Sequence, residues 1–200
     1  MRGIFLVFLL FLASSLVNCK QSAKATPQLV TISIQPFADI PEEEVQYIYT
    51  ELKKVYPLVA VRNKIAFPDH TMNQLGYRYR ADSLLQYLNT VVHQNEIIIG
   101  LTGRDISTTK ANIADWGVMG LGYAPGKVCV ASSFRLVQQK RMEQFVKVAE
   151  HELGHTEGLQ HCPVKTCIMR DAAGGNTLDE EKEFCVNCRT HLIKRFWKLL

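Results

Sequence analysis

The chain has 200 residues, of which 47% are hydrophobic and 21% charged, as in ordinary globular proteins. This composition excludes a largely disordered chain and a fibrous repeat, and the length suits one domain with a sizeable core. The net charge is only +4, with no run of like charges, so nucleic acid is not an expected partner. Six cysteines need an explanation, because they could form disulfides, bind metal or carry lipid.

The first residues have the features of an export signal. Arg2 precedes an apolar run from Ile4 to Leu12, which is shorter than the roughly 20 residues of a membrane-spanning helix. We therefore predict a signal peptide over residues 1–18.

Cys19 lies at the end of this segment, three residues after Leu16. This spacing resembles the lipobox of bacterial lipoproteins, although Asn18 departs from the small residue that the pattern prefers before the cleavage point. We predict lipidation of Cys19, a polar tether over residues 19–28, and an exported protein anchored to a membrane by its lipid. A soluble secreted or periplasmic protein is the alternative.

Residues 29–200 are predicted to form a single domain. Alternation of apolar and polar residues, helical stripes and turn residues predict its elements in chain order. They are a half-buried strand over 29–35, a helix from Pro41 to Val55, a strand over 58–61, a loop over 62–80, a helix over 81–93, a central strand over 96–101, a polar stretch over 103–115, a hairpin of 118–123 and 127–132, and a helix over 140–157. A capping-box pattern, Thr177 to Glu180, predicts a last helix from about residue 177. This order predicts a mixed α/β sheet.

The strongest motif is HELGHTEGLQH over residues 151–161, an HExxHxxGxxH pattern. On a helix, His151 and His155 lie on one face, so both imidazoles can reach one ion. Gly158 can end the helix, because glycine accepts a left-handed backbone, and the chain can then bring in His161 as a third ligand.

Three imidazoles leave an open position on a zinc ion for water, whose pKa the zinc lowers to about 7. Glu152 is placed to take the proton of that water as general base and pass it to the leaving amine. The motif predicts a zinc peptidase; the alternative is a zinc protein that binds peptides without cleaving them.

Four cysteines follow the histidines: Cys162, Cys167, Cys185 and Cys188. Four thiolates can close a tetrahedral structural zinc site, whereas export favours two disulfides. The spacing alone leaves both possibilities open. Cys129 lies in an apolar strand and is predicted to be a buried free thiol.

Together, the histidine motif, the adjoining Cys162, the Cys167-Ile168-Met169 triplet and the CxxC at 185–188 resemble the archaemetzincin family of metzincin zinc metallopeptidases. The resemblance extends over about residues 29–196. The gap from Met169 to Cys185 is slightly shorter than the family pattern.

The resemblance implies a metzincin-like mixed twisted sheet with an active-site helix, then a zinc-stabilised loop and a C-terminal helix. It implies two zinc ions per chain. The catalytic ion is bound by His151, His155 and His161, and the structural ion by Cys162, Cys167, Cys185 and Cys188. Met169 is implied to pack beneath the histidines.

The resemblance also implies that an edge strand binds extended peptide, and the candidate residues are Val118, Met119, Gly120 and Leu121. We expect a peptide or protein substrate and a monomer. Endopeptidase and aminopeptidase action are both compatible with the motif.

Overall fold

The computed structural model describes residues 27–73 and 76–199, and a twisted five-stranded sheet lies at its centre. The strand order is β2-β1-β4-β8-β7; β7 is antiparallel to β8, and all other neighbours are parallel. The bounds are β1 Thr31–Pro36, β2 Val59–Val61, β4 Glu96–Thr102, β7 Gly120–Gly122 and β8 Val128–Ser132. The predicted mixed α/β fold is confirmed, and β7 forms one edge of the sheet.

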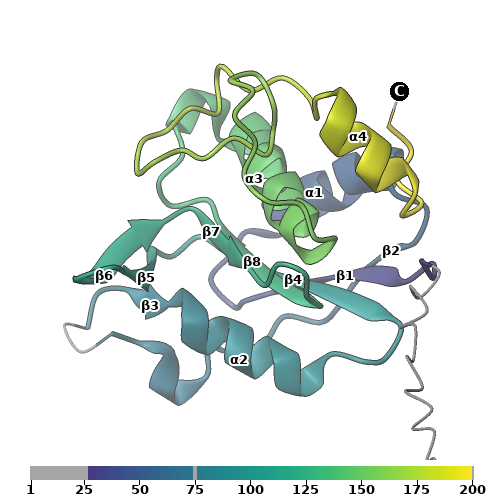
Figure 1. Cartoon of the computed structure of the whole chain (residues 1–200). Coiled ribbons are helices and arrows are strands. Elements are labelled where there is room, and N and C mark those ends of the chain that lie inside the picture. Colours follow the sequence, from purple (N-terminus) through teal and green to yellow (C-terminus); the bar gives the residue numbers. More distant parts are fainter. Residues whose placement is uncertain (1–26, 74–75, 200) are drawn as a thin grey trace, which may run out of the picture.

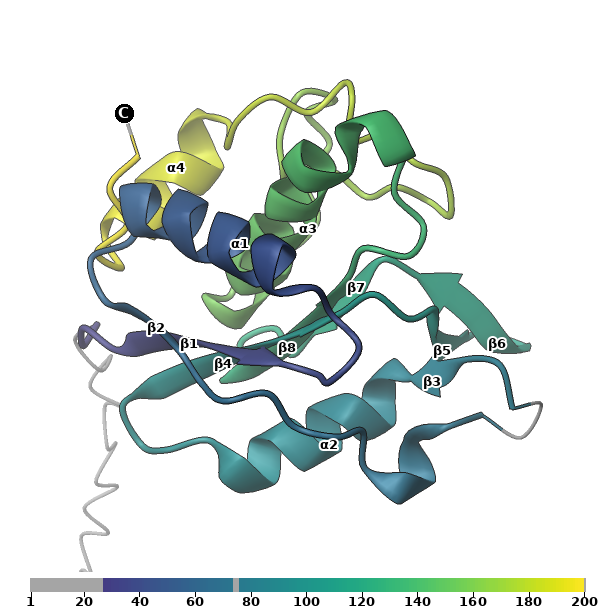
Figure 2. The same cartoon turned by 180° about the vertical axis from the view of Figure 1, so that it is seen from behind.

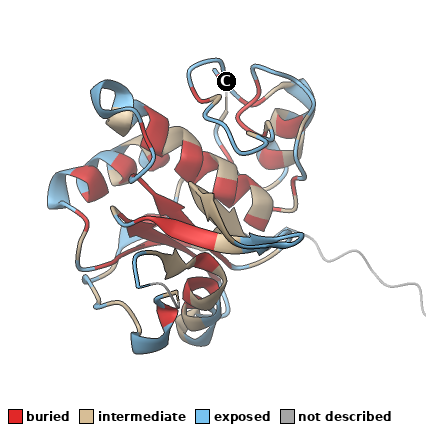
Figure 3. Ribbon diagram, turned by 90° about the vertical axis from the view of Figure 1, so that its left-hand side faces the viewer, coloured by how far each residue is buried: buried red, intermediate tan, exposed pale blue. Residues whose placement is uncertain are grey.

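Helices cover both faces of this sheet (Figures 1 and 2). Three helices lie on one face, namely α1 Glu42–Val55, α3 Arg141–Thr156 and α4 Val186–Ile193, and α2 Ala81–Val91 lies on the other. Two short 3-10 turns complete the helical pieces, η1 Asp69–Thr71 and η2 Gln138–Lys140. Buried residues concentrate along the sheet and on the helix sides that face it (Figure 3). The predicted helices near 41–55, 81–93 and 140–157 are confirmed. No helix among the described residues combines the length and apolarity needed to cross a membrane.

β1 is buried on both faces, so the expectation of a half-buried strand was wrong. Ser33 and Gln35, on its polar side, are each only 3% exposed. β1 lies between β2 and β4, with helices above and below, and the side chain of Gln35 donates to the backbone oxygen of Asn63 at 2.8 Å. Hydrogen bonding of this kind lets a polar side chain remain in a buried strand.

A second, three-stranded sheet lies beside the first, in the order β3-β5-β6. It contains β3 Tyr79–Arg80, β5 Ile106–Lys110 and β6 Ile113–Val118, where the sequence predicted only a loop and an unassigned polar stretch. β5 and β6 form an antiparallel hairpin, and β6 leads through Met119 directly into β7. The hairpin therefore projects from the start of the predicted edge strand.

No helix begins at Thr177, so the capping-box prediction was wrong. The backbone N–H of Lys182 donates to Thr166 at 2.8 Å, and Glu183 forms a bridge with Cys167. These bonds to the preceding loop hold residues 182–183 extended. The last helix, α4, begins at Val186 with Cys185 as its N-cap, and ends at Ile193.

Candidate metal centre and substrate cleft

The last two turns of α3 place two histidines of the motif side by side. The Nδ1 of His151 donates to the backbone oxygen of Ile168 at 2.6 Å, and the Nδ1 of His155 donates to that of Leu159 at 2.8 Å. A carbonyl oxygen only accepts, so both rings carry their proton on Nδ1 and leave Nε2 as an unprotonated acceptor.

The two free Nε2 atoms face each other at 3.1 Å. Neither can donate to the other, so their lone pairs repel unless a cation lies between them. Two nitrogens on one tetrahedral zinc lie about 3.3 Å apart, close to this spacing. Burial, together with the neighbouring His155, lowers the pKa of His151 to about 4, so the ring is neutral as a metal ligand must be. These histidines therefore fit a zinc ion.

The third histidine comes from the segment that follows α3. Gly158 has a left-handed backbone, with φ of +95°, and turns the chain at the predicted point. His161 is thereby brought back to the other two, and one ring nitrogen from each histidine lies within 4.8 Å of the others. Asp171 lies 3.6 Å from the Nδ1 of His161, a contact that the sequence analysis did not foresee.

The side chain of Glu152 extends from α3 toward the edge strand β7. Its side chain sits directly against Gly120, where a Cβ would overlap the carboxylate. The residue is only 6% exposed, and burial raises the pKa of Glu152 to about 8. Burial alone disfavours the charged carboxylate, whereas a cation held nearby would favour it and lower the pKa again.

The four cysteines gather into a second cluster, with all four Sγ atoms within 4.8 Å of one another. The Sγ atoms of Cys162 and Cys185 are 3.7 Å apart. Sulfurs on one tetrahedral zinc lie about 3.8 Å apart, whereas a disulfide needs about 2.05 Å. The described cysteines are all free, and Cys129 is fully buried as predicted. The cluster therefore suits a zinc ion rather than two disulfides.

Met169 connects the two clusters. Its backbone oxygen accepts a hydrogen bond from the N–H of Cys162 at 2.7 Å. Its buried sulfur lies directly against Gly154, which lies between His151 and His155 in the sequence of α3. The structure thus places Met169 beneath the histidines. Gly154 was missed by the sequence analysis, although it lies inside the motif, because its role depends on a contact from a distant segment.

A cleft of about 690 Å³ opens above the histidines. The predicted edge residues Val118, Met119, Gly120 and Leu121 all line it, with Val118 at the end of β6 and Gly120 and Leu121 in β7. Trp116 contributes to its wall by packing against Gly174, in the loop after Met169. Trp116, Gly174 and Arg135 all line the cleft, and none of them was predicted from the sequence as a site residue.

The comparison with protein families agrees with this arrangement. The sequence model of peptidase family M54 matches residues 30–195. The chain belongs to peptidase family M54. This M54 protein is 33% identical to the archaemetzincin of Methanopyrus kandleri, over 68% of this chain and 78% of that relative. It is 28% identical to the archaemetzincin of Haloquadratum walsbyi, over 78% of this chain and 96% of that relative.

Solved archaemetzincin structures have the same fold. The archaemetzincin of Archaeoglobus fulgidus, crystallised with malonate, gives a TM-score of 0.70 at 27% identity, covering 80% of this chain and 99% of that one. That of Methanopyrus kandleri gives 0.69 at 27% identity, covering 82% and 95%. The predicted archaemetzincin membership is confirmed. The M54 protein is a zinc-dependent metallopeptidase that acts on peptide or protein substrates.

Proposed function

We propose that the M54 protein cleaves peptide bonds at a zinc ion held by His151, His155 and His161. The observation that carries this proposal is the pair of unprotonated Nε2 atoms facing each other at 3.1 Å, each fixed by a backbone carbonyl on its other ring nitrogen. Bound zinc would supply Lewis acidity to a water molecule and to the substrate carbonyl.

Glu152 acts as the general base and acid of the reaction. Its carboxylate accepts a proton from the attacking water and later delivers that proton to the leaving amine. Burial beneath Gly120 keeps bulk water away from the carboxyl group and fixes its direction toward the cleft. A protein that only binds peptides has no need of a buried carboxyl at this point, and the family relationship also disfavours that alternative.

The test replaces the carboxylate without changing its shape. In Glu152→Gln we expect peptide hydrolysis to fall by at least about 100-fold, because general acid–base catalysis contributes that much or more. The zinc content should stay the same. Glu143→Gln is the matched control, since Glu143 is on the same helix with an exposed side chain. Unchanged hydrolysis in Glu152→Gln would contradict the assigned role.

A second zinc ion is held by Cys162, Cys167, Cys185 and Cys188. The 3.7 Å separation of the Cys162 and Cys185 sulfurs supports this assignment. So does the donation of the Cys185 N–H to the sulfur of Cys167 at 3.3 Å, because such bonds stabilise thiolate ligands. This ion would fix the loop that carries Met169 beneath the histidines.

Extended peptide adds to the free edge of β7. The edge position of β7 in the sheet supports this role, because an edge strand has backbone N–H and C=O groups available to a partner strand. Met119 and Leu121 would then contact alternate substrate side chains.

The protein is exported, anchored through lipid on Cys19, and monomeric. Residues 1–26, which carry the signal segment and Cys19, lie outside the described residues. Mass analysis should find a lipid mass on Cys19, and Cys19→Ala should release the protein from membranes. Unmodified soluble protein that begins after Cys19 would contradict the lipid anchor.

A further inference from the structure

We propose that Arg135 recognises a carboxylate of the peptide substrate and so determines specificity in the cleft. This inference rests on the proposed peptidase function. Arg135 follows β8 and lines the same cleft as His151 and Glu152. Its ligand is either an acidic side chain or the free carboxyl terminus of the peptide, which present the same group.

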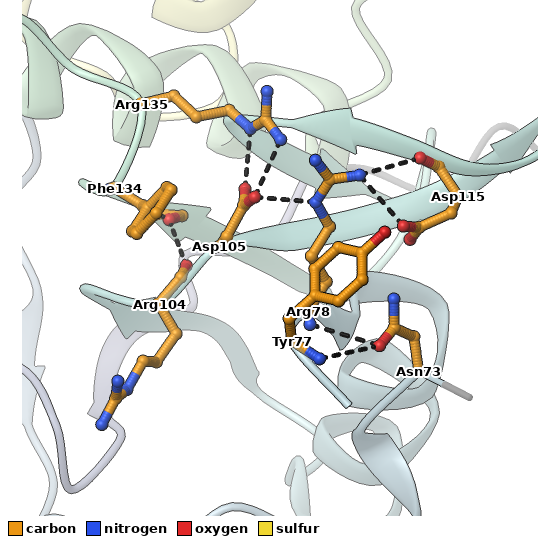
Figure 4. Close-up of polar contacts among 9 residues, drawn as sticks. Asn73, Tyr77, Arg78, Arg104, Asp105, Asp115, Phe134 and Arg135 are labelled. Atoms are coloured by element: carbon orange, nitrogen blue, oxygen red, sulfur yellow. Dashed lines mark hydrogen bonds and ion pairs between the residues drawn. The ribbon is translucent and has the colours of Figure 1, made fainter. Parts of the chain in front are cut away.

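The guanidinium of Arg135 is held in a fixed position (Figure 4). Its Nε donates to Asp105 Oδ1 at 2.7 Å and its Nη2 to Oδ2 at 2.9 Å, a bidentate pair. Asp105 also accepts from Arg78 Nε at 2.7 Å, and Arg78 in turn bonds Asp115 at 3.0 Å. Because the Asp105 side chain is only 10% exposed and bonded from two sides, Arg135 cannot swing away from the cleft without breaking this network.

Part of the guanidinium remains available to a ligand. Both bonds to Asp105 use Nε and Nη2, and Nη1 has no hydrogen-bond partner among the described residues. The side chain is 33% exposed. An arginine fixed in this way loses little conformational entropy when its remaining donors bind a carboxylate.

The position of Arg135 along the substrate strand follows from two glycines. A Cβ on Gly117 would overlap the guanidinium of Arg135, and a Cβ on Gly120 would overlap the carboxylate of Glu152. Gly117 belongs to β6 and Gly120 to β7, and three residues of chain span at most about 10 Å. A peptide lying along this edge would therefore present its carboxylate to Arg135 on the β6 side of the point where Glu152 acts, no more than about three residues from it.

Three other charged groups that line the cleft, Lys110, Arg170 and Glu181, each interact with a neighbouring side chain. Lys110 lies over the ring of Trp116, 5.1 Å from its centroid, and Arg170 pairs with Glu180 at 2.7 Å. Glu181 is 2% exposed and accepts from the hydroxyl of Thr177 at 2.7 Å. A preference for basic peptides that depended on Glu181 would contradict the proposal.

The test compares peptides that differ only in one carboxylate, using the zinc-loaded full chain. One arm replaces Asp or Glu by Asn or Gln at each position, and the other replaces a C-terminal acid by its amide. We expect a preference for the carboxylate at one position, about 10- to 100-fold in kcat/KM, as one charge-assisted hydrogen-bonded pair provides. The two arms identify whether the carboxylate belongs to a side chain or to the terminus.

Variants assign the preference to Arg135. Arg135→Gln should abolish it, mainly by raising KM for the acidic peptide, and Arg135→Lys should keep part of it. The ratio between the two peptides is measured within each variant, so a loss of folded protein cancels. Arg104→Gln is the control: Arg104 is exposed, does not line the cleft, and points away from the Asp105 network (Figure 4). An unchanged ratio in Arg135→Gln would overturn the proposal.

A binding measurement separates this proposal from the peptidase function. Calorimetric titration of zinc-loaded Glu152→Gln with the same peptide pairs should show tighter binding of the acidic peptide, and Arg135→Gln in that background should remove the difference. If this difference appears but the wild type cleaves no peptide, the peptidase proposal fails and the role of Arg135 stands. Equal binding of both peptides would overturn the role of Arg135.

Discussion

At the scale of single residues, the cleft depends on glycines as much as on its ionisable groups. Gly117, Gly120 and Gly154 lie directly against Arg135, Glu152 and Met169 respectively, with no room for a Cβ. The motif gives the proposed ligands and base by residue type, but the glycines decide how closely the neighbouring side chains approach the strand or helix. Such contacts involve residues far apart in the chain, so one sequence does not predict them.

Gly120→Ala should lower kcat by about 10- to 100-fold, because the added methyl group displaces the Glu152 carboxylate by about 1 Å, and misplacement of that size is costly. Steady-state kinetics with a cleaved peptide, together with zinc analysis, measure this effect. Zinc content should not change, because the added Cβ would meet the side chain of Glu152, which is not a proposed zinc ligand. Gly175→Ala is the control, since its Cβ would lie 3.4 Å from the nearest atom; equal activity of both variants would contradict the packing argument.

Gly154→Ala should destabilise the zinc-loaded protein by about 1–3 kcal/mol, as overpacking does. In an ordinary helix interior the same change stabilises by up to about 1 kcal/mol. The sign is reversed here because the new Cβ would overlap the Met169 sulfur. Urea unfolding gives the free energy of both single variants and of Gly154→Ala/Met169→Ala. The double variant should lose less than the sum of the two singles; simple additivity would show that the two residues do not compete for space.

At the scale of whole elements, the sequence predicted the helices and the central strands, and failed where distant backbone partners decide the structure. The active-site helix was predicted because its motif and apolar stripe are local. The β5–β6 hairpin was missed because its Ser, Thr and Lys residues show no clear alternation, and its partner strand β3 is only two residues long. The helix expected from Thr177 does not form, since Thr166 and Cys167 bind the backbone of residues 182–183.

An ion pair joins the elements at the other end of the sheet from the cleft. Glu96 begins β4, and Arg62, which follows β2, donates to it at 2.6 Å. Burial raises the pKa of Glu96, but hydrogen bonds from Ser33, the His93 N–H and Arg62 outweigh burial and lower it below 4.5 overall. A carboxyl with a lowered folded-state pKa stabilises the fold above its unfolded pKa, and this contribution is lost as pH falls through the folded value.

Glu96→Gln should therefore be about 1–2 kcal/mol less stable than wild type at pH 7, as expected for a hydrogen bond to a charged group. The difference should shrink as the pH is lowered below about 4.5 and Glu96 becomes protonated. Urea unfolding at a series of pH values measures it. Zinc release at low pH affects both proteins alike, so it cancels in the difference. A gap that stays constant down to low pH would show that the charge of Glu96 contributes nothing.

At the scale of the whole molecule, the histidine cluster and the cysteine cluster share the segment of chain that follows α3. The histidines belong to α3 and the chain after it, and the cysteines tie that chain to α4. Met169 and Cys162 are joined by a backbone hydrogen bond of 2.7 Å, so the cysteine cluster supports the floor of the histidine site. The two sites should therefore differ in what their loss does: one carries the chemistry, and the other holds the fold around it.

Substitution of one ligand in each cluster separates the catalytic role from the structural role. Elemental analysis should give two zinc ions per chain in the wild type and one in each of His161→Asn and Cys162→Ser. His161→Asn should lose activity and should lose less stability than Cys162→Ser, because His161 is half exposed. Cys162→Ser should lower both, and an ion present at about 1,000 times its dissociation constant contributes about 4 kcal/mol of stability. Thermal unfolding and peptide hydrolysis of the same preparations measure the two effects. A Cys162→Ser protein with full stability and two zinc ions would contradict the cysteine site, whereas one zinc ion in the wild type would leave only one of the two clusters as a metal site.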